Sequence, residues 1–261
     1  MESAERTGVL RLELVDPAGP GALDGARVRA ARAALTTLTV DRQGGRPSPT
    51  AVLIAHPGPN FCVGGDVGGF ATADDPGSFV AAAAAEFHSL IRALVGCPVP
   101  VISAVRGWAA GAGLSIVAGS DLVLASDRAR FRPAYPGIGF SPDGGMTWTL
   151  PRAVGRARAL DILLRNRVLD AQQAAGIGLV SEVVPDAELD AEALRVAEEL
   201  ATGPVTAYEE IKALMSAGAE AGLNEQLDAE AAAIARCAAG PEGREGVAAF
   251  VARRSPQFTR P

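Results

Sequence analysis

The sequence has few residues of the kinds that bind metals or form disulfides. It contains three cysteines and two histidines, and aromatic residues make up 5% of its 261 positions. Cys62, Cys97 and Cys237 form no C-x-x-C pair and no cysteine–histidine cluster with metal-ligand spacing, so we expect no metal site. A sparse, odd number of cysteines is typical of a reducing compartment. Since the polar residues 1–6 do not resemble a signal peptide, we expect a cytoplasmic protein.

Positive charge and long apolar runs are also scarce. Lysine and arginine number 24 against 30 aspartates and glutamates, which leaves a formal net charge of -6. No basic stripe with interleaved aromatic residues is present, so we expect no nucleic-acid partner. No apolar run approaches the roughly 18 residues of a membrane span, so we expect no membrane partner. The chain is long enough for one large domain or two small ones.

The first half of the chain alternates short apolar runs with helical patterns. Buried or half-buried strands are predicted over residues 9–15, 50–55, 99–105 and 122–125, and an extended piece begins at Phe131. Helices are predicted over 24–38, with Asp24 as the N-cap, and over 79–95. Strands separated by helices predict parallel βαβ units whose helices cover the sheet.

The pattern changes after Pro142. Every element predicted beyond it is a helix, over residues 143–154, 156–164, 171–175, 190–201, 205–217, 223–238 and 241–251. We therefore expect an α/β N-terminal part and an all-helical C-terminal part.

Two glycine-rich segments, residues 58–66 and 107–115, are the most informative feature of the chain. Each follows a predicted strand, and the second leads into an apolar helix. Glycines allow main-chain N–H groups to point into a pocket, although either segment alone could be a tight turn. Two converging N–H groups can stabilise an oxygen that becomes an oxyanion. A dinucleotide site is not expected, because position 116 is isoleucine and the run does not extend to G-x-G-x-x-G.

Several side chains near these segments are candidates for chemistry or for structure. Asp143 stands at the start of a predicted helix, where it could be an N-cap as well as an acid. Ser115 lacks the G-x-S-x-G context, and both histidines precede it, so a hydrolase triad is not expected. Nothing beside Cys62 would lower its pKa, so it is not expected to be a nucleophile. His88 lies near Glu86 on a predicted helix, where packing or exposure is the expected role.

Taken together, these segments resemble the crotonase (enoyl-CoA hydratase/isomerase) superfamily, closest in pattern to its enoyl-CoA isomerases. The resemblance covers nearly the whole chain in order, and it is carried by residues 61–66, 100–113, 121–125, 131, 138–155 and 174–185. It implies an α/β fold, a crotonase-like spiral of ββα units with a helical C-terminal trimerisation region. Residues 1–200 would form the acyl-CoA-binding core and residues 201–261 the oligomerisation region.

The resemblance also implies a substrate, an assembly and a set of site residues. The substrate would be an acyl-CoA thioester, with no cofactor besides the CoA that is part of it, and the chain would form a homotrimer or a dimer of trimers. The main-chain N–H groups of Gly65 and Ala112 would form the oxyanion hole. Ala112 would open a helix whose N-terminus adds favourable potential.

Further residues would bind the CoA part of the substrate. The backbone around Leu23, Val63 and Asp66 would line the adenine and pantetheine channel, although residues 21–23 read Gly-Ala-Leu where the family usually has Asn-Ala-Leu. Asp66 could instead anchor its own loop through neighbouring N–H groups. Lys212, with the arginines at 253 and 254, could approach the CoA phosphates from a neighbouring subunit, or simply face solvent.

Departures from the family pattern bear on the reaction. The two positions where the family's hydratases carry glutamates are Ser115 and Tyr135 here, and Tyr135 could donate a hydrogen bond to the substrate or simply pack. What remains is Asp143, in a Pro-Asp-x-Gly pattern similar to that of the family's isomerases. Hydration must activate water and also deliver a proton, whereas moving a double bond needs one base. The pattern therefore favours an enoyl-CoA isomerase in which Asp143 is the general acid/base.

Apolar side chains at Phe140, Met146 and Trp148 would raise the pKa of an aspartate and make it a stronger base. Hydration, decarboxylation and ring formation on the same oxyanion hole stay open, and so does a catalytically silent acyl-CoA-binding protein.

Overall fold

The structure, a computed structural model, describes residues 8–46 and 48–258. The segment 1–6, on which the expectation of no signal peptide rests, lies outside the described residues. The chain is a mixed α/β protein around a five-stranded sheet in which every neighbouring pair is parallel. In spatial order its strands are β1 (Val9–Leu12), β2 (Ala51–Ile54), β3 (Val101–Val105), β5 (Leu122–Ser126) and β8 (Glu182–Val184).

A second, smaller sheet has three short strands. They are β4 (Trp108–Ala110), β6 (Arg130–Arg132) and β7 (Leu169–Asp170), with β6 in the centre. β4 pairs parallel to β6, and β6 pairs antiparallel to β7. β4 belongs to the second glycine-rich segment, so part of that segment is a strand.

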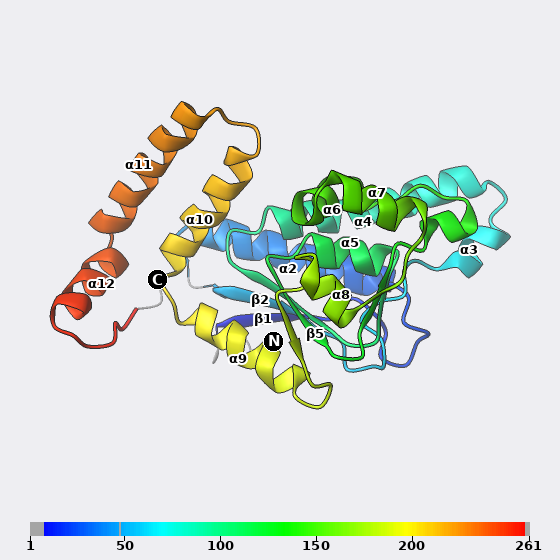
Figure 1. The fold of residues 1–261 in the computed structure, drawn as a ribbon, viewed down its shortest axis with the longest axis horizontal. Helices are drawn as coiled ribbons and strands as arrows, with labels where there is room; N and C mark the ends of the chain where they lie inside the picture. The colour runs from blue at the N-terminus through cyan, green and yellow to red at the C-terminus, as the bar shows by residue number, and fades with distance from the viewer. Residues whose placement is uncertain (1–7, 47, 259–261) are drawn as a thin grey trace.

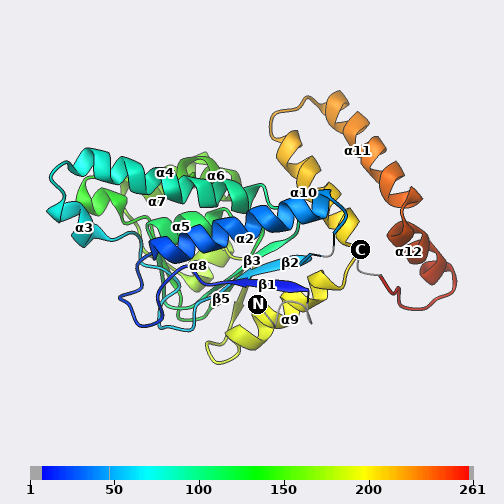
Figure 2. The same cartoon turned by 180° about the vertical axis from the view of Figure 1, so that it is seen from behind.

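The large sheet is covered on both faces. On one face lie α2 (Gly25–Gln43), α4 (Pro76–Val95) and α5 (Ala112–Ala118), and on the other lies α9 (Leu189–Ala201) (Figures 1 and 2). β2 shows why: Val52 and Ile54 belong to the main core cluster, whereas Ala51 and Leu53 pack with α9. Successive side chains of a strand point to opposite faces, so a fully apolar strand requires cover on both sides.

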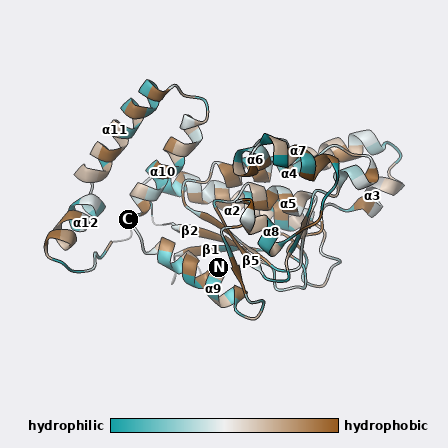
Figure 3. Ribbon diagram, viewed as in Figure 1, coloured by the Kyte–Doolittle hydropathy of each residue, from teal (hydrophilic) through white to brown (hydrophobic). Residues whose placement is uncertain are grey.

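The remaining helices follow the chain around and away from this core. They are α3 (Val67–Thr72), the 3-10 helix η1 (Tyr135–Ile138), α6 (Met146–Val154), α7 (Arg156–Leu164), α8 (Ala171–Gly176), α10 (Val205–Gly218), α11 (Leu223–Ala239) and α12 (Pro241–Val251). α11 and α12 stand away from the sheet (Figures 1 and 2). Apolar residues recur along both of them (Figure 3).

Several predicted elements are confirmed. Asp24 caps α2, because its carboxylate accepts a hydrogen bond from the N–H of Arg27 at 2.8 Å. α7 and α12 have the predicted bounds, and the other C-terminal helices agree within a few residues.

Other predicted elements were wrong. The C-terminal part is not all-helical, because β8 pairs with β5 and completes the large sheet. Its three residues are too short a run for periodicity to identify. The helix predicted from residue 143 begins at Met146, because Gly144 and Gly145 have positive φ angles of 61° and 74°.

α4 is, by length and composition alone, a helix that could cross a membrane. No continuous apolar run in the sequence indicates such a helix. In the fold, its Phe87, Leu90, Ile91 and Leu94 pack in the main core, at the spacing of one helical face. An apolar core helix passes the same test of length and composition.

Candidate active site

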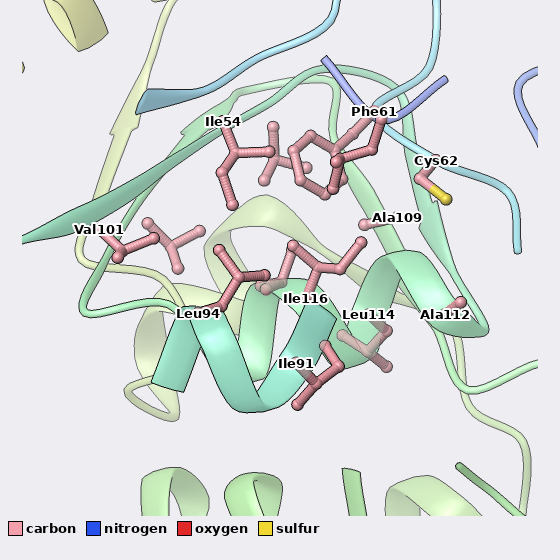
Figure 4. Packing of buried hydrophobic residues seen from close by; sticks show 14 of the residues in the cluster. Ile54, Phe61, Cys62, Ile91, Leu94, Val101, Ala109, Ala112, Leu114 and Ile116 are labelled. Atoms are coloured by element: carbon pink, nitrogen blue, oxygen red, sulfur yellow. The ribbon is translucent and has the colours of Figure 1, made fainter. Parts of the chain in front are cut away.

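The two glycine-rich segments lie side by side. The N–H of Cys62 donates to the carbonyl oxygen of Trp108 at 3.0 Å, and the N–H of Ala110 donates to the carbonyl oxygen of Cys62 at 2.8 Å. Cys62, Ala109 and Ala112 accordingly lie at the same end of the core cluster (Figure 4). Gly113 permits this approach, since a Cβ atom there would overlap the carbonyl oxygen of Cys62.

The main-chain N–H groups of Gly65 and Ala112 come from the point where these segments meet. The carbonyl of Gly64 accepts a hydrogen bond from Leu23 at 2.8 Å, so the planar trans peptide directs the Gly65 N–H the opposite way. The carbonyl of Gly111 accepts from Ser115 inside the first turn of α5, so the Ala112 N–H points out of the helix start. Neither N–H donates to an acceptor in the described part of the chain.

The two segments are in close contact at the residues that directly precede these donors. A Cβ atom at Gly111 would lie 3.5 Å from the Cα atom of Gly64, and Gly65 and Ala112 are the next residues on each segment. Two available N–H groups from adjoining segments are what an oxyanion hole requires. That Gly65 and Ala112 bind a substrate oxygen stays a prediction.

Hydrogen bonds within the chain hold the backbone that is predicted to line the CoA channel. Val63 donates its N–H to Gly21 at 2.9 Å, and with the bond from Leu23 to Gly64 this pairs residues 21–23 with the first glycine segment. The carboxylate of Asp66 accepts from the N–H of Gly69 at 3.2 Å and caps α3. The interpretation of Asp66 as a loop anchor is therefore confirmed.

Three segments converge on Asp143. The hydroxyl of Tyr135, on η1, donates to Oδ1 of Asp143 at 2.5 Å, and Oγ of Ser115, on α5, donates to its main-chain oxygen at 3.0 Å. From α4, Nε2 of His88 lies 3.7 Å from Oδ2 of Asp143 and accepts the N–H of Gly144 at 3.1 Å. Ser115 and Tyr135, which stand at the two hydratase glutamate positions, therefore both form hydrogen bonds with Asp143.

The carboxylate of Asp143 is available for chemistry because it does not cap a helix. The N-cap of α6 is Gly145, which forms no side-chain cap bond, so the N-cap interpretation of Asp143 was wrong. About a third of the Asp143 side chain, 31%, is exposed. Its partner Ser115 lies three residues after Ala112 on α5, a rise of about 4.5 Å along the helix. The main-chain oxygen of Asp143 is therefore bound by a residue that lies about one helical turn along α5 from Ala112.

Burial determines which groups of the site stay neutral. Burial, and next the charge of Asp143, raise the pKa of Tyr135 above its usual value, so the phenol remains protonated and donates to the carboxylate. Burial also raises the pKa of Cys62 to about 12 and keeps its thiol protonated. A protonated thiol is a poor nucleophile, in agreement with the sequence interpretation of Cys62.

The surroundings of Asp143 are more polar than expected. The groups at hydrogen-bond or ion-pair distance from its carboxylate are Tyr135 and His88. Of the apolar side chains expected there, Met146 is buried, but Phe140 and Trp148 are 40% and 44% exposed. That these apolar side chains act on Asp143 stays a prediction.

Lys212 does not join the site within this chain. Its ammonium donates to the carbonyl oxygen of Val99 at 3.0 Å and pairs with the carboxylate of Asp121. These partners precede β3 and β5, whereas the glycine segments follow the carboxyl ends of β2 and β3. The length of β3 separates the two edges by on the order of 15 Å. The prediction that Lys212 binds CoA is thus unsupported in the protomer, where the ammonium stabilises the opposite edge of the sheet.

His88 is the member of the cluster whose role sequence reasoning missed. One signal could have found His88: it lies three residues before the buried Ile91, at the edge of the apolar face of α4. A Cβ atom at Gly145 would lie 3.7 Å from Ile91, so this edge faces the turn that carries Asp143.

A cavity lies outside this cluster, at the C-terminal helices. This cavity of about 210 Å³ lies between α10 and the start of α12, lined mainly by apolar atoms, with Pro204, Ala207, Cys237 and Phe258 in its wall. Within the part of the chain that the structure describes, no group of three histidine, cysteine, aspartate or glutamate residues is arranged to bind a metal ion.

Comparisons with known proteins agree in family and in fold. Residues 4–261 match the model of the enoyl-CoA hydratase/isomerase family. The chain is 36% identical to a "probable enoyl-CoA hydratase" of Rhodobacter capsulatus over 85% of this chain and 86% of that protein. It is 42% identical to 1,2-epoxyphenylacetyl-CoA isomerase of Escherichia coli over 66% of each. A crystal structure described as an enoyl-CoA hydratase/isomerase from Mycobacterium abscessus covers 98% of this chain and 97% of its own, with a TM-score of 0.91 and 35% identity.

Proposed function

Because the chain belongs to the enoyl-CoA hydratase/isomerase family and has the crotonase fold, we propose that it moves a carbon–carbon double bond of an enoyl-CoA thioester. The observation that carries this proposal is the cluster around Asp143. Ser115 and Tyr135 are hydrogen-bonded to that residue and offer no carboxylate of their own. The site thus has one carboxylate acid/base, which is what isomerisation needs.

The proposed reaction uses that base twice. The carboxylate of Asp143 takes a proton from C2 of a 3-enoyl thioester, and the electron pair moves into a dienolate whose oxygen carries the negative charge. The N–H groups of Gly65 and Ala112 stabilise this oxygen as the charge develops. Asp143 then returns the proton at C4, which leaves the double bond between C2 and C3. No water is consumed and no atom is gained or lost.

Tyr135 and Ser115 orient the base for these two transfers. The phenol occupies Oδ1, so Oδ2 is the oxygen left to carry the proton. Ser115 holds the main chain of the same residue. A base that serves two carbons in turn must keep its position while the dienolate exists, and geometric control of this kind contributes strongly to rate.

Similarity to an isomerase supports the reaction, and similarity to a hydratase keeps a second candidate. The Escherichia coli relative is named as an isomerase, whereas the Rhodobacter capsulatus relative is named as a hydratase. Hydration needs a base for water as well as a proton donor to carbon. The hydroxyls of Ser115 and Tyr135 are poor substitutes for a glutamate base, since the pKa of Tyr135 is raised by burial.

The reaction can be tested with 3-enoyl-CoA and 2-enoyl-CoA supplied separately. We expect interconversion of the two, with no gain of water. Replacing Asp143 by Asn should lower kcat by about 10²- to 10⁴-fold, since it removes the general base. Binding of the thioester should change by less than about threefold, because the N–H donors and the channel are intact.

Three outcomes would contradict the proposed isomerisation or the role of Asp143 in it. Addition of water to 2-enoyl-CoA without interconversion would favour a hydratase. Tight thioester binding with no exchange of the C2 proton in deuterium oxide would indicate a silent binding protein. Near-native turnover by the Asp143→Asn variant would remove Asp143 as the proton carrier.

We also propose that the chain assembles through its C-terminal helices. Several large apolar side chains on α10–α12 are more than half exposed in the protomer: Ile211, Met215, Leu223, Leu227, Ile234, Val247, Phe250 and Val251. Many large apolar side chains left exposed on neighbouring helices are typical of an interface. A homotrimer or a dimer of trimers is the assembly that the resemblance implies.

A further inference from the structure

The peptide unit that joins Asp143 to Gly144 is held at both of its polar groups. Its carbonyl oxygen accepts from Ser115 on α5 at 3.0 Å, and its N–H donates to Nε2 of His88 on α4 at 3.1 Å. The carboxylate of Asp143 is bound separately by Tyr135. Three other elements of the fold therefore fix the position of the proposed base, and His88 supplies the acceptor for one of these bonds.

The hydrogen bond assigns the state of the imidazole. A nitrogen that accepts a hydrogen bond carries no proton, so His88 is neutral and its proton is on Nδ1. The same Nε2 lies 3.7 Å from Oδ2 of Asp143. Protonation would turn Nε2 into a donor, which cannot accept the N–H of Gly144 and is attracted to Oδ2. With 39% of its side chain exposed, His88 can exchange protons with solvent.

The charged and titratable groups on the neighbouring elements mostly have partners of their own. On α4, Glu86 pairs with Arg29 of α2 at 2.9 Å and Arg92 donates to Ser89. On α6, Arg152 lies over the ring of Trp148. Asp66 caps α3, and Tyr135 donates to Asp143. Among the described residues, Asp143 is the carboxylate at ion-pair distance from the imidazole.

We propose that His88 is a positioning residue for Asp143 that works only as the neutral imidazole. Neutral His88 holds Gly144 and so fixes the turn that carries the base. Protonated His88 releases Gly144 and pairs with Oδ2, the oxygen that transfers the proton. Protonation of the imidazole therefore switches the site off. This inference rests on the proposed function of Asp143.

Two substitutions separate the acceptor role of His88 from its charge. In His88→Gln, the amide oxygen can occupy the place of Nε2, accept the N–H of Gly144 and remain uncharged. In His88→Leu, the N–H loses its acceptor. His56, the other histidine, provides the control His56→Asn, because its Nδ1 accepts from Gly58 and an Asn oxygen can replace it.

We measure kcat and KM for the 3-enoyl-CoA thioester from about pH 5 to 8. The wild type and His56→Asn should lose kcat toward acid pH. His88→Gln should keep kcat within about threefold of the wild type at pH 8 and lose less of it at pH 5. His88→Leu should lower kcat by about 10- to 100-fold at every pH, with little change in KM, as expected for the loss of a partly buried hydrogen bond. Equal kcat profiles for His88→Gln and the wild type, or equal impairment of the Gln and Leu variants, would overturn the proposal.

The state of His88 can be read without any activity. Nitrogen NMR of the ring should show a neutral imidazole with its proton on Nδ1 near pH 8. A proton on Nε2 would overturn the proposal even in an active enzyme. If the protein fails to isomerise any enoyl-CoA while NMR finds the proton on Nδ1, the proposed function fails and the assignment of the hydrogen bond stands.

Discussion

Gly144 is the position at which the fold and the site depend most on the absence of a side chain. A Cβ atom there would overlap the ring of Phe87 and lie 2.9 Å from Cβ of Ser115, and the backbone has a φ angle of 61°. The neighbouring Gly145 has a similar φ of 74°, but a Cβ atom there would meet its nearest neighbour, Ile91, at an ordinary 3.7 Å. Alanine substitutions at the two glycines therefore distinguish the cost of backbone strain, which both share, from the cost of crowding, which only Gly144 has.

The expected effects follow from these contacts. An alanine with left-handed backbone costs roughly 1–2 kcal/mol, which is the whole expected cost of Gly145→Ala. Gly144→Ala adds roughly 1–3 kcal/mol for crowding against Phe87 and Ser115, so its total is about 2–5 kcal/mol. For a chain of this size, each kcal/mol lowers Tm by about 2–4 °C. Displacement of Ser115 should also lower kcat in Gly144→Ala, since Ser115 holds the main chain of Asp143.

The assay is thermal unfolding of both variants at one protein concentration, because assembly makes Tm depend on concentration. Turnover at saturating thioester is measured beside it. Equal losses of Tm in the two variants would show that the turn relaxes around the new methyl group. The packing of Gly144 against α4 and α5 would then not be what holds Asp143 in place.

Two further predictions concern burial. Burial raises the pKa of the Cys62 thiol from 9.0 to about 12, so the unfolded chain loses this proton at a lower pH than the folded chain does. The free energy of unfolding should therefore fall as pH rises from 9 toward 12, by about 1.4 kcal/mol per pH unit for one thiol. Cys62→Ala should lose this share of the slope in denaturant titrations at several pH values, and an unchanged slope would contradict the burial argument. Phe250 is 85% exposed in the protomer, so Phe250→Glu should lower the mass measured by light scattering toward that of one chain. A wild-type protein that is already a single chain at micromolar concentration would contradict assembly through α10–α12.

The sequence by itself determined most of the N-terminal strands, the C-terminal helices and the resemblance to the family. Strands such as 51–54 and 101–105 are continuous apolar runs, and the cap at Asp24 is a local hydrogen bond, so each can be recognised within a few residues. Local signals of this kind do not depend on what packs against them. The glycine segments were also visible, because their composition is unusual wherever they lie.

Tertiary structure alone decided what surrounds Asp143 and what Lys212 does. His88, Ser115 and Tyr135 are separated from Asp143 by 55, 28 and 8 positions, and no local pattern predicts that their side chains meet. The cap at the start of α6 was mistaken because two glycines with positive φ displace the helix start by three residues. Lys212, on α10, pairs with Asp121 although the two residues are 91 positions apart in the sequence. Contacts between distant segments depend on how elements pack, and that packing is a property of the whole chain.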